Sequence, residues 1–352
     1  MKKETIKELR EYLIDELRDY KGKPIKLDLP QDLLEEILFE YQKNGSKVFS
    51  KELSSDIIHK IDFTGISFKD FLCNIDFTGI RGVVIKPQEV YDKKLIDAKL
   101  NGVLLDLDGG FDGVCLQNTS FKGAKAKDGS LITIDPQILA YRNMRECVFD
   151  GVVFTGSFNG TTVENAIFRG SIGAKIDPQT LINKSLKNTI LCGVEFINNF
   201  IGVNVEFADF TGSKNAVINP QTILNKLLLY TKLTDAYVVG DDMRDVILRY
   251  TDFTGCKGEV CINPRTISSK GLQGCKLSGV RIVGTIEDCD LVMADFTGSI
   301  GAVIDTDSCS LYDTNLTDAK VYGSEEEEKE KEKIKSIIRY TITGKIPFPG
   351  LK

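Results

Sequence analysis

The stretch Phe207-Ala-Asp-Phe-Thr-Gly-Ser-Lys-Asn-Ala-Val-Ile-Asn-Pro-Gln-Thr-Ile223 decides the fold, because most of the chain consists of copies of it. Its second half is one of five related segments, which carry Pro87, Pro136, Pro178, Pro220 and Pro264, and a weaker copy covers residues 304–309. The intervals between successive prolines are similar, and the two middle ones are identical. A repeat of nearly constant length indicates a solenoid, a propeller or another array.

A shorter period of five residues runs inside each long repeat. Large apolar residues recur in pairs five positions apart: Phe63 and Phe68, Leu100 and Leu105, Phe149 and Phe154, Leu191 and Phe196, Leu277 and Ile282, Leu311 and Leu316. A small or short apolar residue stands two positions before most of them. A period of five matches neither an amphipathic helix nor a flat strand. It predicts a chain that turns a corner every five residues.

Three of these units, Ala208-Asp-Phe-Thr-Gly212, Ala294-Asp-Phe-Thr-Gly298 and Cys275-Lys-Leu-Ser-Gly279, resemble the repeating unit of the pentapeptide repeat proteins. The resemblance covers about residues 61–323. It implies an all-β solenoid, a right-handed quadrilateral β-helix in which four pentads make one coil. About a dozen coils would stack at the usual strand spacing of about 4.8 Å.

Packing arguments favour the same architecture. A narrow four-sided tube has room in each corner for one large and one short side chain, and Phe with Ala, Cys or Val fills that space at native density. Each coil would depend on its neighbours for hydrogen bonds and for its buried face.

The inserts that contain the prolines interrupt the pentads once per long repeat. Asp135, Asp177, Asn219 and Asn263 precede the prolines and are predicted N-caps, and a proline suits the first helical position. We therefore expect each insert to form a single helical turn outside a corner. One face of every second coil should be irregular, and one long repeat should correspond to two coils.

The ends of the chain differ from the repeats. Residues 1–60 are predicted to form a helical N-terminal cap, with helices within 1–22 and 30–43 and a capping box at Thr5-Ile-Lys-Glu8. A partner-binding helical hairpin is the alternative. Residues 324–352 are predicted to form a C-terminal helix and tail, for which a dimer contact is the alternative. The sequence therefore leaves monomer and dimer open.

Composition is that of a soluble protein, with 42% hydrophobic and 27% charged residues. No apolar run approaches the roughly 20 residues that a membrane span requires, so no membrane association is predicted. The residues that follow Met1 lack the apolar core of a signal peptide. A cytoplasmic location is therefore expected, and export by a route without a cleaved signal stays open.

The nine cysteines follow the repeat and show no ligand spacing. Cys147, Cys275, Cys289 and Cys309 each stand two residues before a core position, where Ala stands in other units, so they are predicted to be small apolar fillers. The total is odd and no Cys-X-X-Cys occurs. We expect reduced thiols, no metal and no cofactor.

Catalytic chemistry is not predicted. The chain has one histidine, His59, and neither a Gly-X-Ser-X-Gly nor a phosphate-loop motif. Outward Asp residues are abundant because the pentad places them there, so paired carboxylates carry no catalytic information. An enzyme that acts on an extended polymer is the remotest alternative.

Two sets of charged residues recur with the repeat and are the candidate sites. Six residues after each insert proline stands a base, and we call this set the basic row: Lys93, Arg142, Lys184, Lys226 and Lys270. A second set is expected to gather as an acidic stripe: Asp106, Asp108, Asp112, Glu164, Glu206, Asp241, Asp242, Asp245, Glu287 and Asp288. The competing interpretation is that both sets only keep a long regular surface soluble.

The predicted function is a non-catalytic protein-binding or scaffold module with an unidentified protein partner. The family resemblance implies an alternative, because some members imitate duplex DNA and bind type II topoisomerases such as gyrase. Duplex DNA about 60 Å long carries about 35 negative charges, whereas this chain has a net charge of −6. DNA mimicry is therefore the second choice, and nucleic acid itself is not an expected partner.

Overall fold

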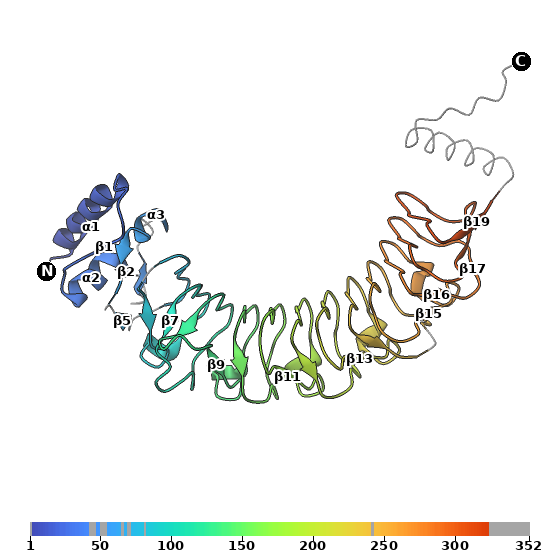
Figure 1. Ribbon diagram of the computed structural model, residues 1–352, viewed down its shortest axis with the longest axis horizontal. Coiled ribbons are helices and arrows are strands. Elements are labelled where there is room, and N and C mark those ends of the chain that lie inside the picture. The colour runs from blue at the N-terminus through green and yellow to red at the C-terminus, as the bar shows by residue number, and fades with distance from the viewer. Residues whose placement is uncertain are drawn as a thin grey trace, which may run out of the picture. The chain divides into compact units, whose positions relative to one another are not determined.

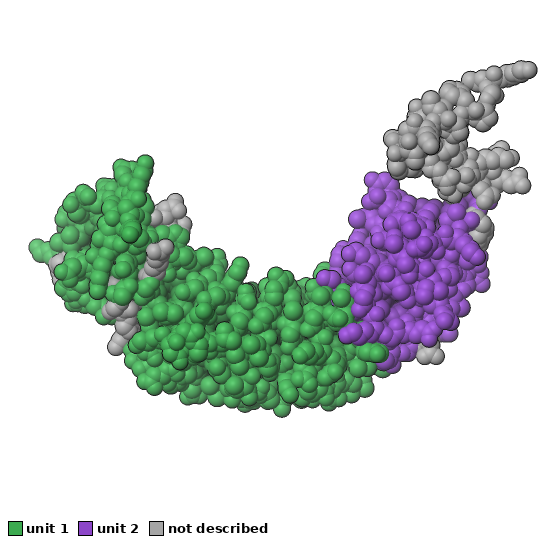
Figure 2. Space-filling model, viewed as in Figure 1, with its two compact units in different colours: residues 1–218, 222–225, 234–237 green, residues 219–221, 226–233, 238–352 purple. Residues whose placement is uncertain are grey.

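The computed structural model describes residues 2–41, 47–49, 55–64, 67–68, 72–80, 82–240 and 243–323. The chain divides into two compact units (Figure 2): unit 1 contains residues 1–218, 222–225 and 234–237, and unit 2 contains residues 219–221, 226–233 and 238–352. The helix and tail predicted for residues 324–352 lie outside the described residues.

The helices of unit 1 are α1 (Lys3–Arg18), α2 (Gln31–Leu38) and the short α3 (Ser55–Ile58). Leu17 of α1 and Leu34 of α2 are buried, so these apolar faces are turned inward as predicted. The helix expected within 30–43 ends at Leu38, because the chain continues into a strand at Phe39. The capping-box prediction was wrong: the N-cap is Lys2, with no side-chain cap bond, because the helix begins earlier and encloses Thr5. No helix among the described residues is both long and apolar enough to cross a bilayer.

The strands are very short, because the chain turns a corner after each of them. Near the N-terminal end, β1 (Ile25–Lys26) pairs in parallel with β4 (Ile61–Asp62), and β2 (Phe39–Tyr41) pairs antiparallel with β3 (Lys47–Phe49). The strands of the coil are β5 (Ser67–Phe68), β6 (Val84–Ile85), β7 (Leu104–Leu105), β8 (Lys125–Ala126), β9 (Thr133–Ile134), β10 (Val153–Phe154), β11 (Lys175–Ile176), β12 (Glu195–Phe196), β13 (Val217–Ile218), β14 (Tyr237–Val238), β15 (Cys261–Ile262), β16 (Arg281–Ile282), β17 (Thr285–Ile286), β18 (Val303–Asp305) and β19 (Lys320–Tyr322).

The coil has four faces, and about a dozen turns of it are described (Figure 1). The first face stacks single parallel bridges, such as those that join Val148, Ile167, Ile190 and Asp209 in unit 1. The second face carries the short strands, the third carries the inserts, and the fourth carries bridges such as Lys94 to Cys115.

The bridges of the first face also give the length of a coil. Each bridge joins one coil to the next, so Val148 and Ile190 are two coils apart. Their separation along the chain equals that of Pro136 and Pro178, which mark successive long repeats. The prediction that one long repeat equals two coils is therefore confirmed.

The core follows the predicted five-residue register. Phe149 and Phe168 are fully buried, and their ring centroids lie 5.3 Å apart on adjacent coils. The small positions two residues earlier, Cys147 and Ala166, are buried as well, and in unit 2 the same arrangement places Cys275 beside Leu277. Large and short side chains therefore alternate inward, which is why the coil can close around a narrow core.

Corners depend on residues with positive φ. Gly151 and Gly212 have φ values of 77° and 75°, and Asn165 and Asn188 adopt the same region at 60° and 56°. Gly reaches this region without steric cost, and Asn tolerates it better than other residues with side chains. The recurrent Thr-Gly pairs of the sequence are thus corner residues.

The inserts are not the predicted helical turns outside the corner. Asp177 Oδ1 accepts a hydrogen bond of 2.9 Å from the Gln179 N–H and so closes a turn. It does not cap a helix as predicted, because the 3₁₀ element that follows has Leu181 at its N-cap position, with no side-chain cap bond. Leu181 is then extended, and Asn183 in the 3₁₀ element η3 (Ile182–Lys184) has a φ of 59°. Both Pro178 and Leu181 are buried. The insert makes two successive turns because it must supply two side chains to the core.

Candidate functional site

The basic row occupies one defined place in the repeat. Its members are the last residues of the five 3₁₀ elements, η1 (Tyr91–Lys93), η2 (Ala140–Arg142), η3, η4 (Leu224–Lys226) and η5 (Ser268–Lys270). All five have positive φ, between 43° and 52°. The insert therefore places each base at the corner that leads from the third face to the fourth.

Several bases contact the turn of the next coil. In unit 1, Lys93 Nζ donates to the Asp112 carbonyl oxygen at 3.0 Å. In unit 2, Lys226 Nζ lies 3.5 Å from Asp245 Oδ2, and Lys270 Nζ lies 3.3 Å from Asp288 Oδ2. Since these partners belong to the second set of candidates, the structure brings part of the acidic stripe to the basic row.

A glutamine after each of the first four insert prolines bridges the same coils, and the sequence interpretation missed it. Gln179 Nε2 donates to the carbonyl oxygens of Asn199 and Ile201 at 3.1 and 2.8 Å. Lys184 of the basic row holds Gln179 by donating to its Oε1 at 2.8 Å. Gln88 and Gln137 make matching pairs of bonds. The signal was the recurrent Pro-Gln pair, which we interpreted only as a helix start.

The acidic residues lie on more than one edge of the coil. Asp106 and Asp108 follow strand β7 and contact Lys127 and Lys86 at 3.5 and 3.4 Å. The Asp108 N–H donates a hydrogen bond to Asp106 Oδ1. This bond, together with the nearby charge of Lys127, holds the pKa of Asp106 below its usual value. Most other described members are also ion-paired: Glu164 with Arg145, Glu206 with Lys187, Glu287 with Arg265. Asp241 and Asp242 lie outside the described residues.

These acidic residues lie at both edges of the fourth face. Glu164 and Glu206 stand two residues after the bridge residues Thr162 and Asn204. Asp245 and Asp288, described within unit 2, stand two residues before bridge residues of that face. Because most carboxylates have a basic neighbour of the same chain, the local surface is close to neutral.

His59 and the buried cysteines have structural contacts. His59 Nε2 lies 2.6 Å from the carbonyl oxygen of Thr78. The Cys147 thiol donates to the Leu116 carbonyl oxygen, and the Cys275 thiol to that of Leu248, each at 2.8 Å. Burial raises the pKa of Cys147 and of Cys275 to about 12, so both thiols stay protonated at neutral pH. No group of three or more metal-binding side chains is found among the described residues.

Two hollows on the surface of unit 1 are lined by described residues and concern the candidate site. The larger, about 510 Å³, lies on the first face and is lined by Asp76, Thr78, Asp97, Lys99, Asn101, Asn118, Ser120, Glu146 and Val148. Its polar groups largely bind one another: Lys99 Nζ lies 2.9 Å from Asp76 Oδ2, and Ser120 Oγ donates to Asn101 Oδ1 at 2.6 Å. This network leaves the larger hollow with few groups that are free to select a ligand.

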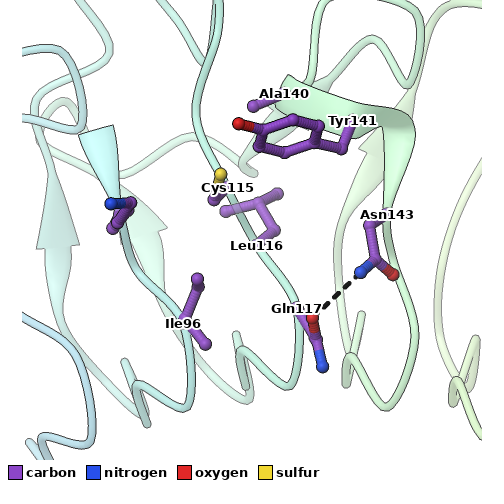
Figure 3. A pocket seen from close by; sticks show the side chains of 8 residues that line it. Ile96, Cys115, Leu116, Gln117, Ala140, Tyr141 and Asn143 are labelled. Carbon is purple, nitrogen blue, oxygen red and sulfur yellow. Dashed lines mark hydrogen bonds between the residues drawn. The ribbon is translucent and has the colours of Figure 1, made fainter. Parts of the chain in front are cut away.

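The smaller hollow, about 200 Å³, lies on the fourth face (Figure 3). It is lined by Lys94, Ile96, Cys115, Leu116, Gln117, Ala140, Tyr141 and Asn143. The Tyr141 ring and Ala140 stand at one end, and Gln117 and Asn143 at the other (Figure 3). Asn143 Nδ2 donates to Gln117 Oε1 at 2.9 Å. We call this hollow the fourth-face pocket.

No family model and no curated protein matches the chain. Several solved structures are similar to it, and two of them are described below. HetL, a pentapeptide repeat protein involved in heterocyst differentiation regulation from the cyanobacterium Nostoc sp. strain PCC 7120, is 16% identical, covers 73% of this chain and 90% of its own, and gives a TM-score of 0.22. QnrB1, a plasmid-mediated fluoroquinolone resistance protein, is 13% identical, with coverage of 72% and 96% and a TM-score of 0.18.

Both scores are low, so the assignment of the fold rests on the coil itself: pentads with a large and a small inward residue, four faces and parallel stacking. The fold is that of a pentapeptide repeat β-helix. A fold does not determine a function, so the function has to be argued from the side chains that the coil carries.

Proposed function

We propose that this chain is a non-catalytic module that binds a protein partner through the outward side chains of its coil. The observation that carries the proposal is a cluster of exposed aliphatic residues in unit 1, which we call the third-face patch: Ile182, Ile197 and Ile201. Their exposed fractions are 42%, 60% and 54%. Large apolar residues exposed together are typical of a protein interface.

The members of the third-face patch belong to adjacent coils. The bond from Gln179 Nε2 to the Ile201 carbonyl oxygen places the turn of Ile201 against the insert that carries Ile182. Ile197, on the same coil as Ile201, donates its N–H to the carbonyl oxygen of Ile176. The patch thus lies on a hydrogen-bonded framework, so its residues would lose little conformational entropy when a partner binds.

The absence of catalysis is part of the proposal. His59 already contacts a carbonyl oxygen, and burial raises the pKa values of Cys147, Cys275 and Cys289. A nucleophile needs a thiolate or an adjacent base. These described groups lack that activation.

The test is capture of partners by crosslinking in the native cell, with aspartate introduced into the patch. We expect the double variant Ile197→Asp, Ile201→Asp to lose partners that the natural chain retains. Val283→Asp in unit 2, which changes a similarly exposed aliphatic residue, is the matched control. An identical partner profile for the double variant, with an unchanged thermal midpoint, would remove the third-face patch as the docking surface.

The basic row is a second element of the same proposal. Replacing Lys93, Arg142, Lys184, Lys226 and Lys270 with Gln tests it, since a partner that needs positive charge would be lost while the bulk of the side chains is largely kept. Unchanged capture would assign the row to coil stacking alone, as its contacts with Asp112, Asp245 and Asp288 suggest.

The DNA-mimic alternative receives less support, because most described carboxylates of the proposed acidic stripe are ion-paired within the chain. A DNA mimic needs unpaired negative charge at roughly the density of phosphates. We expect no inhibition of gyrase supercoiling by micromolar purified protein. Inhibition at that concentration would favour the mimic over the proposal.

A further inference from the structure

The fourth-face pocket departs from the repeat at several positions at once. The first residue of the 3₁₀ element is Ile182 in η3 and Leu224 in η4, but it is Ala140 in η2. The middle residue is Asn183 or Asn225 in those elements, but Tyr141 in η2. The smaller Ala140 leaves space that a larger side chain would occupy at the equivalent corner.

Tyr141 stands where a bulky residue is conformationally unfavourable. Its φ is 56°, a region that Asn adopts far more readily. Its side chain is 86% exposed, so burial does not offset this cost. A residue that is both strained and exposed points to a role outside the stability of the coil.

Gln117 is a third departure. It stands two residues after the bridge residue Cys115, a place that the following repeats fill with Glu164 and Glu206. Those two acids are paired with Arg145 and Lys187, whereas Gln117 is neutral and accepts a hydrogen bond from Asn143. The pocket therefore lacks the carboxylate that its counterparts carry.

The backbone also leaves hydrogen-bond donors at this place. The Ala140 N–H bonds to the Val114 carbonyl oxygen at 3.0 Å, as the Ile182 N–H bonds to that of Thr161 in the next repeat, so Cys115 and Asn143 form no bridge. Within the described part of the chain, the N–H groups of Leu116 and Asn143 donate to no acceptor. Donors that lack an acceptor favour a ligand that brings one.

We propose that the fourth-face pocket accepts a leucine-like side chain of a protein partner, together with the adjacent backbone carbonyl oxygen. This proposal deepens the proposed function and rests on it. Ile96, Leu116 and Ala140 line the pocket for the aliphatic group, and the volume of about 200 Å³ has room for one such side chain and the adjacent carbonyl group. Gln117, Tyr141 and the free N–H groups offer donors to the carbonyl oxygen.

The geometry argues for a side chain in a peptide over a free acid. Lys94, the cation that lines the pocket, is already paired with Asp92 at 3.1 Å. A free carboxylate would have no uncommitted cation there, whereas a peptide carbonyl needs only neutral donors. A single apolar anchor of this kind often contributes much of the affinity of a larger interface.

The test uses N-acetyl-leucine N-methylamide as a minimal peptide probe, with ligand-observed NMR on the full chain. We expect a dissociation constant on the order of millimolar, which is usual for so small a ligand. Ala140→Ile, which restores the residue of η3, should weaken binding at least tenfold. Tyr141→Asn should weaken it too, while the thermal midpoint stays equal or rises. Ser268→Ile, the same type of change in η5, should leave binding unaffected.

Cys115 provides a second readout inside the pocket. It is 8% exposed, and its burial raises the pKa of the thiol despite the charge of Lys94, so it should react slowly with iodoacetamide. Probe binding should slow its alkylation further, measured by peptide mapping, while the half-buried Cys192 serves as internal reference. Protection that persists in Ala140→Ile would contradict the assignment.

The outcomes separate this proposal from the proposed function. Failure of the probe to bind the natural chain would overturn the pocket and leave the third-face patch standing. Binding of 4-methylpentanoate without binding of the amide probe would also overturn it, because the site would then select a free acid. If the probe binds as expected but Ala140→Ile still captures every partner from the cell, the pocket is not where a partner docks.

Discussion

Single side chains that fill the coil determine its stability. Phe210 in unit 1 and Phe253 in unit 2 are fully buried at equivalent places of the pentad. The side chains that surround each ring belong to short coils that hold them in place. They can therefore move little to fill the cavity that loss of the ring would leave. The cost of removing either ring should therefore fall in the upper part of the range for core residues.

We expect Phe210→Ala and Phe253→Ala each to lower the free energy of unfolding by about 3–5 kcal/mol. The measurement is urea denaturation followed by far-ultraviolet dichroism. Lys214→Ala, an exposed position close to Phe210, is the control and should change stability by less than about 0.5 kcal/mol. Near-neutral results for both phenylalanines would contradict the inward register on which all outward positions depend.

The insert is the element that distinguishes this coil from a plain array of pentads. Its Asx residue closes the first turn, its proline enters the core, and its glutamine binds two carbonyl oxygens of the next coil. Among the described residues the third face has no strands of its own, so these side-chain bonds satisfy backbone groups that strands would otherwise pair.

We expect Gln179→Ala to lower the free energy of unfolding by about 1–3 kcal/mol, because two carbonyl oxygens lose their donor. Gln179→Glu should be at least as costly, since a carboxylate is isosteric but donates no hydrogen bond. Chemical denaturation measures both, and Thr133→Ala, an exposed strand residue, is the control. If Glu proved as stable as Gln, the two bonds would not be the reason for the Pro-Gln pair.

Across the whole molecule, the sequence predicted the features that lie within one coil. Phe149 and Cys147, or Phe210 and Ala208, reveal the inward register because large and small residues alternate at fixed local spacing. Thr-Gly pairs mark corners for the same reason. The bond from the Gln179 N–H to Asp177 was also predictable, since the two residues are only two positions apart.

Side-chain contacts between different coils were not predicted. Lys226 meets Asp245, and Lys270 meets Asp288, in each case one coil further along the chain. The repeat length gave the length of a coil but not which side chains of neighbouring coils meet, so the two charged sets were treated as separate. The fourth-face pocket was not predicted, because it arises where the small Ala140 replaces a larger residue of the repeat. The sequence patterns that we used are defined by residues that recur, so they do not mark such a position.

One ion pair on the first face of each unit makes the stability of the molecule depend on pH. Lys99 contacts Asp76 at 2.9 Å in unit 1, and Lys276 contacts Asp252 at 3.0 Å in unit 2. Partial burial acts to raise the pKa of Asp252, but hydrogen bonds from Thr254 and Lys276 outweigh it. The pKa of Asp76 is lowered against burial in the same way, by Thr78 and Lys99.

Since both pKa values are lower in the folded chain, each carboxylate stabilises the fold at pH values above its unfolded pKa, near 4, and this contribution disappears as the pH falls through the folded value. We expect Lys99→Ala and Lys276→Ala each to cost about 0.5–1 kcal/mol at pH 7 and clearly less at pH 3. Denaturation at both pH values, with the exposed Lys125→Ala as control, measures the difference. An equal loss at pH 7 and pH 3 would mean that the lysine stems contribute by packing, and that these pairs add no charge-dependent stability to either unit.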